Sequence, residues 1–211
     1  MGELLLVGTV SLLLGMRHAT DPDHVLAVAT IVGSERSLRG AARIGVIWGL
    51  GHAMTLVLVG GSVIAFRLAL SPRVELSLEF AVALMLIVLG AFALLRHDAV
   101  PRATTLRPFA VGSVHGLAGS AAASVLVLST VSDVRWGLTY LVVFGVGTLL
   151  GMAAMTSVLA TPSLLVKRES GSVPRLLRRS AGALTLALGG YLAFRIAVVE
   201  GLFAPALLST R

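Results

Sequence analysis

Histidine and aspartate gather in one short stretch, GMRHATDPDHVLAV, near the amino end of the chain. His18, Asp21 and His24 are three residues apart each time, so a helix would place them within an arc of about 120°. Asp23 would point elsewhere on a regular helix. Pro22 has no N–H and crowds the carbonyl of His18, so we expect the helix to kink or open here and Asp23 to turn inward. Imidazole and carboxylate together suit a borderline divalent cation such as nickel, cobalt or zinc.

A second motif, WGLGHAMT, contains His52 between Gly49 and Gly51, small residues that let a neighbouring helix approach closely. His52 is therefore the candidate for a third imidazole. A histidine that is only hydrogen-bonded to another helix is the alternative that the sequence leaves open. The chain contains no cysteine, which excludes thiolate ligands, so a metal ion must be bound by His, carboxylate, Met or backbone oxygen.

The elements that position these residues are apolar helices. Of the 211 residues, 56% are hydrophobic and 13% are charged, with a mean hydropathy of +0.95. A soluble domain usually has about 25% charged residues. The apolar residues form blocks of about twenty, the length that crosses a bilayer as a helix. The composition predicts an all-α integral membrane protein in a single transmembrane domain, and we interpret the first block as a retained helix.

The apolar blocks predict six membrane-spanning helices, and the basic residues between them predict the orientation. We expect helices at roughly 3–31, 43–66, 76–95, 108–131, 136–160 and 180–200. The first, third and fifth loops contain eleven Lys and Arg residues, and the second and fourth contain three. Cytoplasmic loops carry the excess of positive charge, so the odd loops are predicted inside and both termini outside the cytoplasmic membrane. This distribution explains the net charge of +7 without a nucleic-acid partner.

Three pairs of sequence landmarks predict an internal duplication. GMRH matches GSVH at an offset of 97 residues, GHAMT matches GMAAM at 100, and LGAFALLR matches LGGYLAFR at 99. We expect one three-helix unit over about 1–95 and a second over about 108–200. Three helices are an odd number, so the second unit would lie inverted, as in many secondary transporters. Chance likeness between helices rich in small residues is the alternative.

The second unit contains fewer polar residues at the matching positions. His115 corresponds to His18 and Met152 to His52, whereas the aspartates become Ala118 and Ser120. The metal site is therefore predicted mainly in the first unit. Ionisable residues inside a membrane usually face a bundle interior and mark an ion path. The predicted metal-binding residues are His18, Asp21, Asp23, His24 and His52, and the supporting candidates are Arg17, Pro22, His115 and Met152.

The motif RHATDPDHV is similar to the signature of the nickel/cobalt transporter family, in which a membrane helix carries His, four residues and then Asp-His. His18, Asp23 and His24 match this signature, and GLGHAMT resembles the family's Gly-His motif on the following helix. The segment HGLAGSAA looks like the shorter branch that includes urease-accessory-type permeases. The resemblance implies uptake of Ni²⁺ or Co²⁺ as a transported substrate rather than as a cofactor.

Two other functions remain open from the sequence. An exporter of another solute or metal could share the same fold. An intramembrane metalloenzyme would need an activated water and a general base. Apart from Glu3, Glu79 and Glu200 near span ends, the predicted spans contain no further acidic residue, so we expect a transporter rather than an enzyme. No Walker A motif is present, so ATP coupling would need another chain, and homo-oligomerisation is left open.

Overall fold

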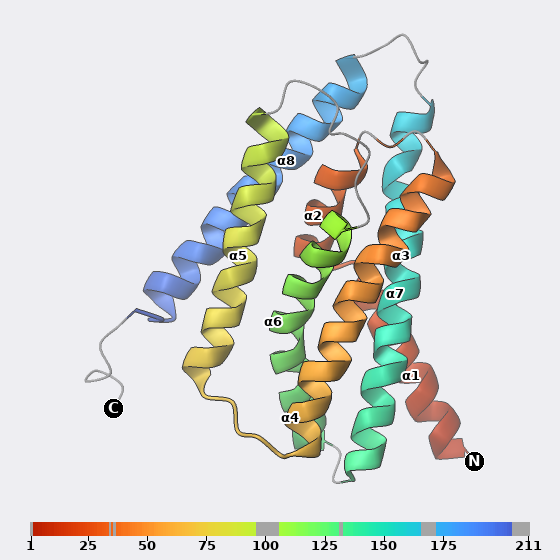
Figure 1. The fold of residues 1–211 in the computed structure, drawn as a ribbon, viewed down its shortest axis with the longest axis vertical. Coiled ribbons are helices and arrows are strands. Elements are labelled where there is room, and N and C mark those ends of the chain that lie inside the picture. The colour runs from red at the N-terminus through yellow and green to blue at the C-terminus, as the bar shows by residue number, and fades with distance from the viewer. Residues whose placement is uncertain are drawn as a thin grey trace.

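The computed structural model describes residues 2–33, 35, 37–95, 106–130, 133–165 and 172–203. The elements in these ranges are helical throughout and form a bundle (Figure 1). In chain order they are α1 (Gly2–His18), α2 (Pro22–Val32), α3 (Leu38–Thr55), the π-helical η1 (Leu56–Gly60), α4 (Gly61–Ala65), α5 (Pro72–Leu95), α6 (Leu106–Thr130), α7 (Val134–Leu165), α8 (Ser172–Phe194) and the π-helical η2 (Arg195–Val199). The predicted all-α class is confirmed.

Four helical stretches among the described residues are long and apolar enough to cross a membrane. They are Leu38–Ala65, Pro72–Leu95, Val134–Pro162 and Arg175–Val199. The first of these combines α3, η1 and α4, since the backbone continues through the π-helical turn without a break. The fold is that expected of a helical membrane protein.

The predicted first span over 3–31 is divided into two helices. α1 ends at His18 and α2 begins at Pro22, so the opening predicted at this proline is observed. Asp21 has φ −62° and ψ 144°, an extended conformation, which agrees with the steric preference of a residue that precedes proline. Pro22 itself occupies the first position of α2, where a missing N–H leaves no hydrogen bond unmade.

Several helix boundaries differ from the predicted ones because polar residues also join the helices. α3 begins at Leu38 rather than near 43, and Ser37 caps it by accepting a 2.9 Å hydrogen bond from the N–H of Gly40. α7 extends to Leu165 and includes Pro162, and α8 begins at Ser172 with basic residues in its early turns. Parts of the predicted loops 97–107 and 162–179 lie outside the described residues.

Glycines allow the helices around the first motif to pack closely. A side chain on Gly15 of α1 would collide with the backbone of Phe144 on α7, and one on Gly112 of α6 would collide with the backbone of Trp48 on α3. Small residues at such crossings are typical of membrane helices. The half-length helix α2 is fixed from another direction, since the Thr185 hydroxyl of α8 donates a 3.0 Å hydrogen bond to the carbonyl of Leu26. The interior ends of α1 and α2 are therefore enclosed by other helices.

Candidate metal centre

Four histidine side chains meet near the break between α1 and α2. His18 ends α1, His24 lies in the first turn of α2, His52 lies in the last turn of α3, and His115 belongs to α6. The ring centroid of His24 is 4.5 Å from that of His18, 5.2 Å from that of His52 and 4.0 Å from that of His115. His24, His52 and His115 are buried, with at most 3% exposure. The structure therefore places His24 between the other three imidazoles.

His18, His24 and His52 form what we call the three-histidine centre. Each offers a nitrogen, and these nitrogens lie within 4.8 Å of one another. Within the described part of the chain, the Nε2 atoms of His18 and His24 and both nitrogens of His52 are buried without a hydrogen-bond partner. Two nitrogens bound to one ion at about 2.1 Å in tetrahedral geometry are about 3.4 Å apart. Small movements of the side chains would bring these nitrogens onto one cation.

The two aspartates of the motif contact the outer sides of the imidazoles. An oxygen of Asp21 lies 2.7 Å from Nδ1 of His18, and an oxygen of Asp23 lies 3.1 Å from Nδ1 of His24. A carboxylate that accepts the Nδ1–H fixes the tautomer in which Nε2 carries the free electron pair, the form that binds a metal ion. The sequence predicted both aspartates as ligands. In this geometry they contact two of the potential ligands, and Asp21 belongs to neither group of potential ligands.

Asp23 also connects the first motif to α6. Its second carboxylate oxygen lies 2.8 Å from Nε2 of His115. Asp23, His24 and His115 therefore form a second group of potential ligands that shares His24 with the three-histidine centre. His115, predicted only as a supporting candidate, is joined directly to the motif.

Other predicted residues lie around this centre. Pro22 starts α2, and Arg17 is exposed at the end of α1, where its carbonyl accepts a hydrogen bond from Thr20. Met152 is fully buried in the apolar core and belongs to neither group of potential ligands. The sequence reasoning did not single out Gly119, although a Cβ there would lie 3.6 Å from Cε1 of His52 and 3.8 Å from Nε2 of His18. The missing side chain leaves space beside the centre.

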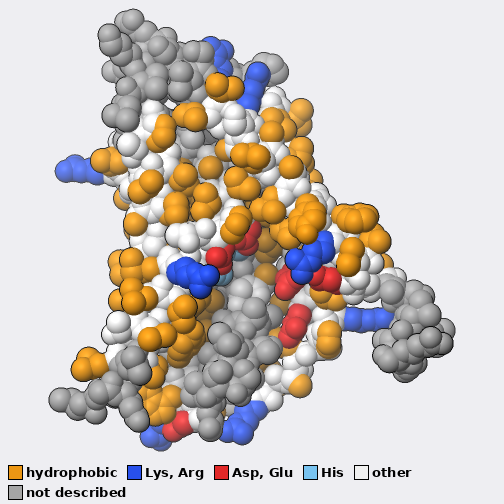
Figure 2. Space-filling model, turned by 180° about the vertical axis from the view of Figure 1, so that it is seen from behind, with side chains coloured by type: hydrophobic (Ala, Val, Ile, Leu, Met, Phe, Trp, Pro, Cys, Tyr) orange, Lys and Arg blue, Asp and Glu red, His pale blue; other side chains and the backbone are white. Residues whose placement is uncertain are grey.

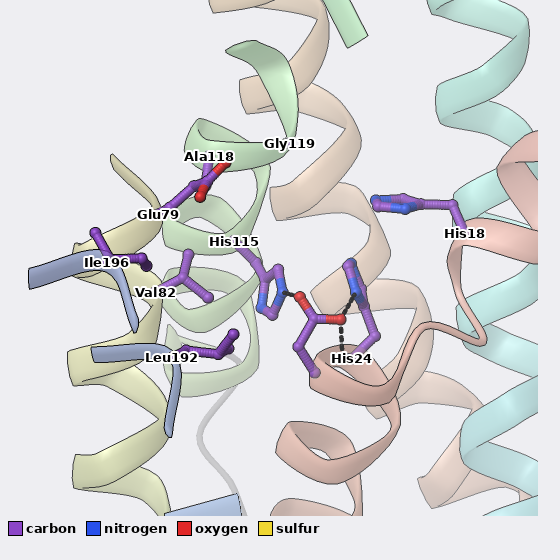
Figure 3. A pocket seen from close by; sticks show the side chains of 10 residues that line it. His18, His24, Glu79, Val82, His115, Ala118, Gly119, Leu192 and Ile196 are labelled. Carbon is purple, nitrogen blue, oxygen red and sulfur yellow. Dashed lines mark hydrogen bonds and ion pairs between the residues drawn. The ribbon is translucent and has the colours of Figure 1, made fainter. Parts of the chain in front are cut away.

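A cavity of about 230 Å³ adjoins the histidines. It is lined by His18, Asp23, His24, Glu79, Val82, His115, Ala118, Gly119, Leu192 and Ile196 (Figure 3). Glu79 comes from α5, so an acidic residue that the sequence placed near a span end borders the same space as the histidines. From outside, carboxylates and the edge of a histidine are visible in a hollow on a face with many apolar side chains (Figure 2).

No protein-family model and no solved structure matches the chain. The chain is 34% identical to the urease accessory protein UreH of Bacillus sp. (strain TB-90), over 95% of this chain and 96% of that protein. It is 26% and 27% identical to the chloroplast proteins FOR GROWTH AND FERTILITY 2 and 1 of Arabidopsis thaliana, over 87% and 79% of this chain. The chain spans about half the length of these two plant proteins, 54% and 52% respectively. The identity to UreH over almost the full length of both proteins shows that the chain belongs to the family of that urease accessory protein.

Proposed function

We propose that this protein transports a divalent transition-metal ion, Ni²⁺ or Co²⁺, across the cytoplasmic membrane, and that the ion binds at the three-histidine centre. The observation that carries the proposal is the convergence of three imidazoles whose buried nitrogens have no hydrogen-bond partner in the part of the chain that the structure describes. Unsatisfied polar atoms are rare in protein interiors and need an explanation, which a bound ion supplies. The relationship to a urease accessory protein favours a nickel-related role. The motif RHATDPDHV supports membership of the nickel/cobalt transporter family.

The chemistry of the centre fits an ion that must bind and leave. Neutral imidazoles replace the water of a borderline dication, and nickel and cobalt favour such nitrogen ligands. The carboxylates of Asp21 and Asp23 contribute negative charge one ring away from the ion, and this charge attracts a dication to the centre. The two carboxylates can therefore offset the charge of the ion without coordinating it at the three-histidine centre. This arrangement supports transport rather than an enzymatic reaction, since each described carboxylate at the centre is already engaged with an imidazole.

We further propose six crossings, with both termini outside, built from two inverted three-helix repeats. In this repeat α1 corresponds to α6 and α3 corresponds to α7. The contacts between the halves are reciprocal, because α1 packs against α7 and α6 packs against α3. A Cβ on Gly90 would contact the backbone of Leu186, and one on Gly189 would contact the backbone of Ile87. Each residue of one contact lies 99 positions from its counterpart in the other, the offset of the LGAFALLR motif. Reciprocal contacts of this kind are those a two-fold axis would produce. The start of α1 and the end of η2 also lie toward the same end of the bundle (Figure 1).

The two halves differ where the metal centre lies. At the offset of 97, Gly119 takes the place of Pro22, and α6 continues through this position without a break. Proline opens the first half and brings two histidines to the interior, whereas glycine in the second half leaves room for them. This difference supports a site supplied mainly by the first repeat.

Uptake of radioactive nickel and cobalt tests the proposal. Proteoliposomes that contain the full chain should accumulate ⁶³Ni²⁺, and His18→Ala should reduce the rate by about tenfold or more, because one nitrogen ligand is lost. His97→Ala is the matched control, since His97 is predicted in a loop and lies outside the described residues. Equal uptake by the wild-type and His18→Ala proteins would refute the proposed site. Nickel efflux without uptake would instead identify an exporter.

A further inference from the structure

We propose that the cavity beside the three-histidine centre holds a second divalent-ion position, with Asp23 and His115 as its ligands and Glu79 at its mouth. This inference rests on the proposed transport of Ni²⁺ or Co²⁺. An ion that enters the protein binds at the second position before it reaches His18, His24 and His52.

The first observation concerns the pair that would bind the ion. Nε2 of His115 is 2.8 Å from the carboxylate of Asp23, and the two residues come from helices that are distant in sequence. Carboxylate and imidazole together form a donor set for a borderline dication. The side chain of His115 is 3% exposed, and its Nδ1 is buried without a partner among the described residues. A buried histidine that only supported packing would be expected to have both nitrogens satisfied.

The second observation concerns the space next to this pair. The cavity of about 230 Å³ has room for several water molecules, so a partly hydrated ion can enter it. Glu79 is exposed, whereas His115 at the inner part of the cavity is buried, so the cavity leads from the surface to the centre. Val82 and Ile196 add apolar side chains to the lining of the cavity (Figure 3). In such surroundings a carboxylate attracts a dication more strongly than in water.

The third observation is that the two positions share a residue. His24 belongs both to the three-histidine centre and to the group with Asp23 and His115. The ring of His24 therefore borders both positions, so an ion travels only a short distance from one to the other. Conduction needs several positions that bind an ion well enough to admit it and weakly enough to release it. Two dications that share a neighbouring residue repel each other strongly, so the second position is expected to bind more weakly while the first is filled.

Ion binding to the full chain in lipid nanodiscs tests this inference. Titration calorimetry with NiCl₂, and the visible absorption of bound Co²⁺, should reveal one tight and one weaker ion for each chain. His115→Gln should remove the weaker ion and retain the tight one. Glu79→Gln should slow ⁶³Ni²⁺ uptake at low nickel concentration about fivefold or more, because a dication meets one carboxylate fewer at the mouth of the cavity. Glu75→Gln is the matched control, since Glu75 lies one turn away on α5 and does not line the cavity.

The outcomes separate this inference from the proposed function. The second position would be overturned if the wild type binds one tight ion, His115→Gln binds the same ion equally well, and Glu79→Gln takes up nickel at the normal rate. This result would leave the transport proposal standing. Loss of all binding in a His115→Gln protein with an unchanged melting temperature would place His115 in a single site and also overturn it. If His115→Gln lowers the melting temperature, the comparison of Glu79→Gln with Glu75→Gln decides, and equal uptake rates would overturn the inference. A wild-type protein that binds neither ion would remove the proposed function itself.

Discussion

Nδ1 of His18 lies 2.7 Å from a carboxylate oxygen of Asp21, so the last residue of α1 is joined to the residue that precedes α2. The bond spans the break in the helix, and Nε2 of His18 stays buried without a hydrogen-bond partner among the described residues. The carboxylate of Asp21 is 47% exposed, so solvent can reach this aspartate while the imidazole nitrogen remains inside. Asp21 therefore orients His18 from the surface side.

Removal of this carboxylate should weaken metal binding without removing a ligand. We expect Asp21→Ala to lower nickel affinity roughly tenfold to hundredfold, the usual effect of losing a carboxylate behind a metal-bound histidine. Asp21→Asn retains an oxygen that accepts the Nδ1–H and should recover part of the affinity. Calorimetric titration of both variants measures this, with Thr20→Ala as the control in the same break. Equal losses in the Ala and Asn variants would instead identify Asp21 as a direct ligand.

Gly119 offers a test in which stability and affinity change in opposite directions. A methyl group there would lie 3.8 Å from Nε2 of His18 and 3.9 Å from Nε2 of His52, ordinary contact distances that require no movement of the two histidines. Alanine is also favoured over glycine in a helix by about 1 kcal/mol. We therefore expect Gly119→Ala to keep or raise the melting temperature while it weakens nickel binding about tenfold or more, because the methyl group occupies space beside the ion.

Gly190→Ala is the matched control, since no atom lies within 4 Å of a Cβ at that position of α8. It should gain the same helix propensity and bind nickel normally. If Gly119→Ala also binds nickel normally, the ion does not lie on the side of the histidines that faces α6.

The sequence predicted the main parts of the candidate site because they are local. Pro22 dictates the break in the helix through the conformation of Asp21, and the spacing of the motif places His18 and His24 on either side of that break. The relation between Asp23 and His115 could not be predicted, since it depends on how α6 packs against α2 and joins residues 92 positions apart. The role of the aspartates also required geometry, because a carboxylate next to an imidazole can contact either the ion or the outer ring nitrogen.

Helix boundaries show a similar limit. Hydropathy predicts the apolar interior of each span, but it places the first turns of α3 and α8 in loops because they contain arginine. A cap such as Ser37 extends a helix beyond its apolar block, and hydropathy does not measure capping. Glu79 was recognised as acidic and near a span end, but its position at the cavity depends on the packing of α5 beside α8.

Replacement of Pro22 should lower nickel affinity without lowering the stability of the protein. In Pro22→Ala the restriction on Asp21 is removed, and the backbone can form helical hydrogen bonds through the break. We expect a protein that is no less stable but binds nickel at least about tenfold more weakly, because His18 and His24 would no longer be held on opposite sides of an open turn. Melting temperature and nickel affinity should be measured on the same preparation. Normal affinity would show that the motif functions as a regular helix.

Nickel binding should weaken in acid. A metal-bound imidazole carries no proton on its ligand nitrogen, so protons and nickel compete, and lower pH favours the metal-free protein. Free histidine titrates near pH 6.5, so the effect should appear below about this value and reach about tenfold per pH unit for each imidazole that must lose a proton. Titrations in buffers with different ionisation enthalpies count the protons released as nickel binds. An affinity that stays constant from pH 7.5 to 5.5 would refute this expected competition, because it would show that the ligand nitrogens carry no proton over this range.

The orientation of the bundle can be tested with single cysteines, because the chain contains none. Ser71 lies between α4 and α5 and is exposed, on the side predicted to face outward. Ser170 lies in the basic fifth loop, outside the described residues, and is predicted inside. In intact cells a membrane-impermeant thiol reagent should label Ser71→Cys and leave Ser170→Cys unlabelled until the cells are opened. The reverse pattern would place the mouth of the Glu79 cavity on the cytoplasmic side, because Glu79 lies two turns into the helix that begins at Pro72. The cavity would then receive ions from inside the cell, and the proposed uptake would have to be replaced by export.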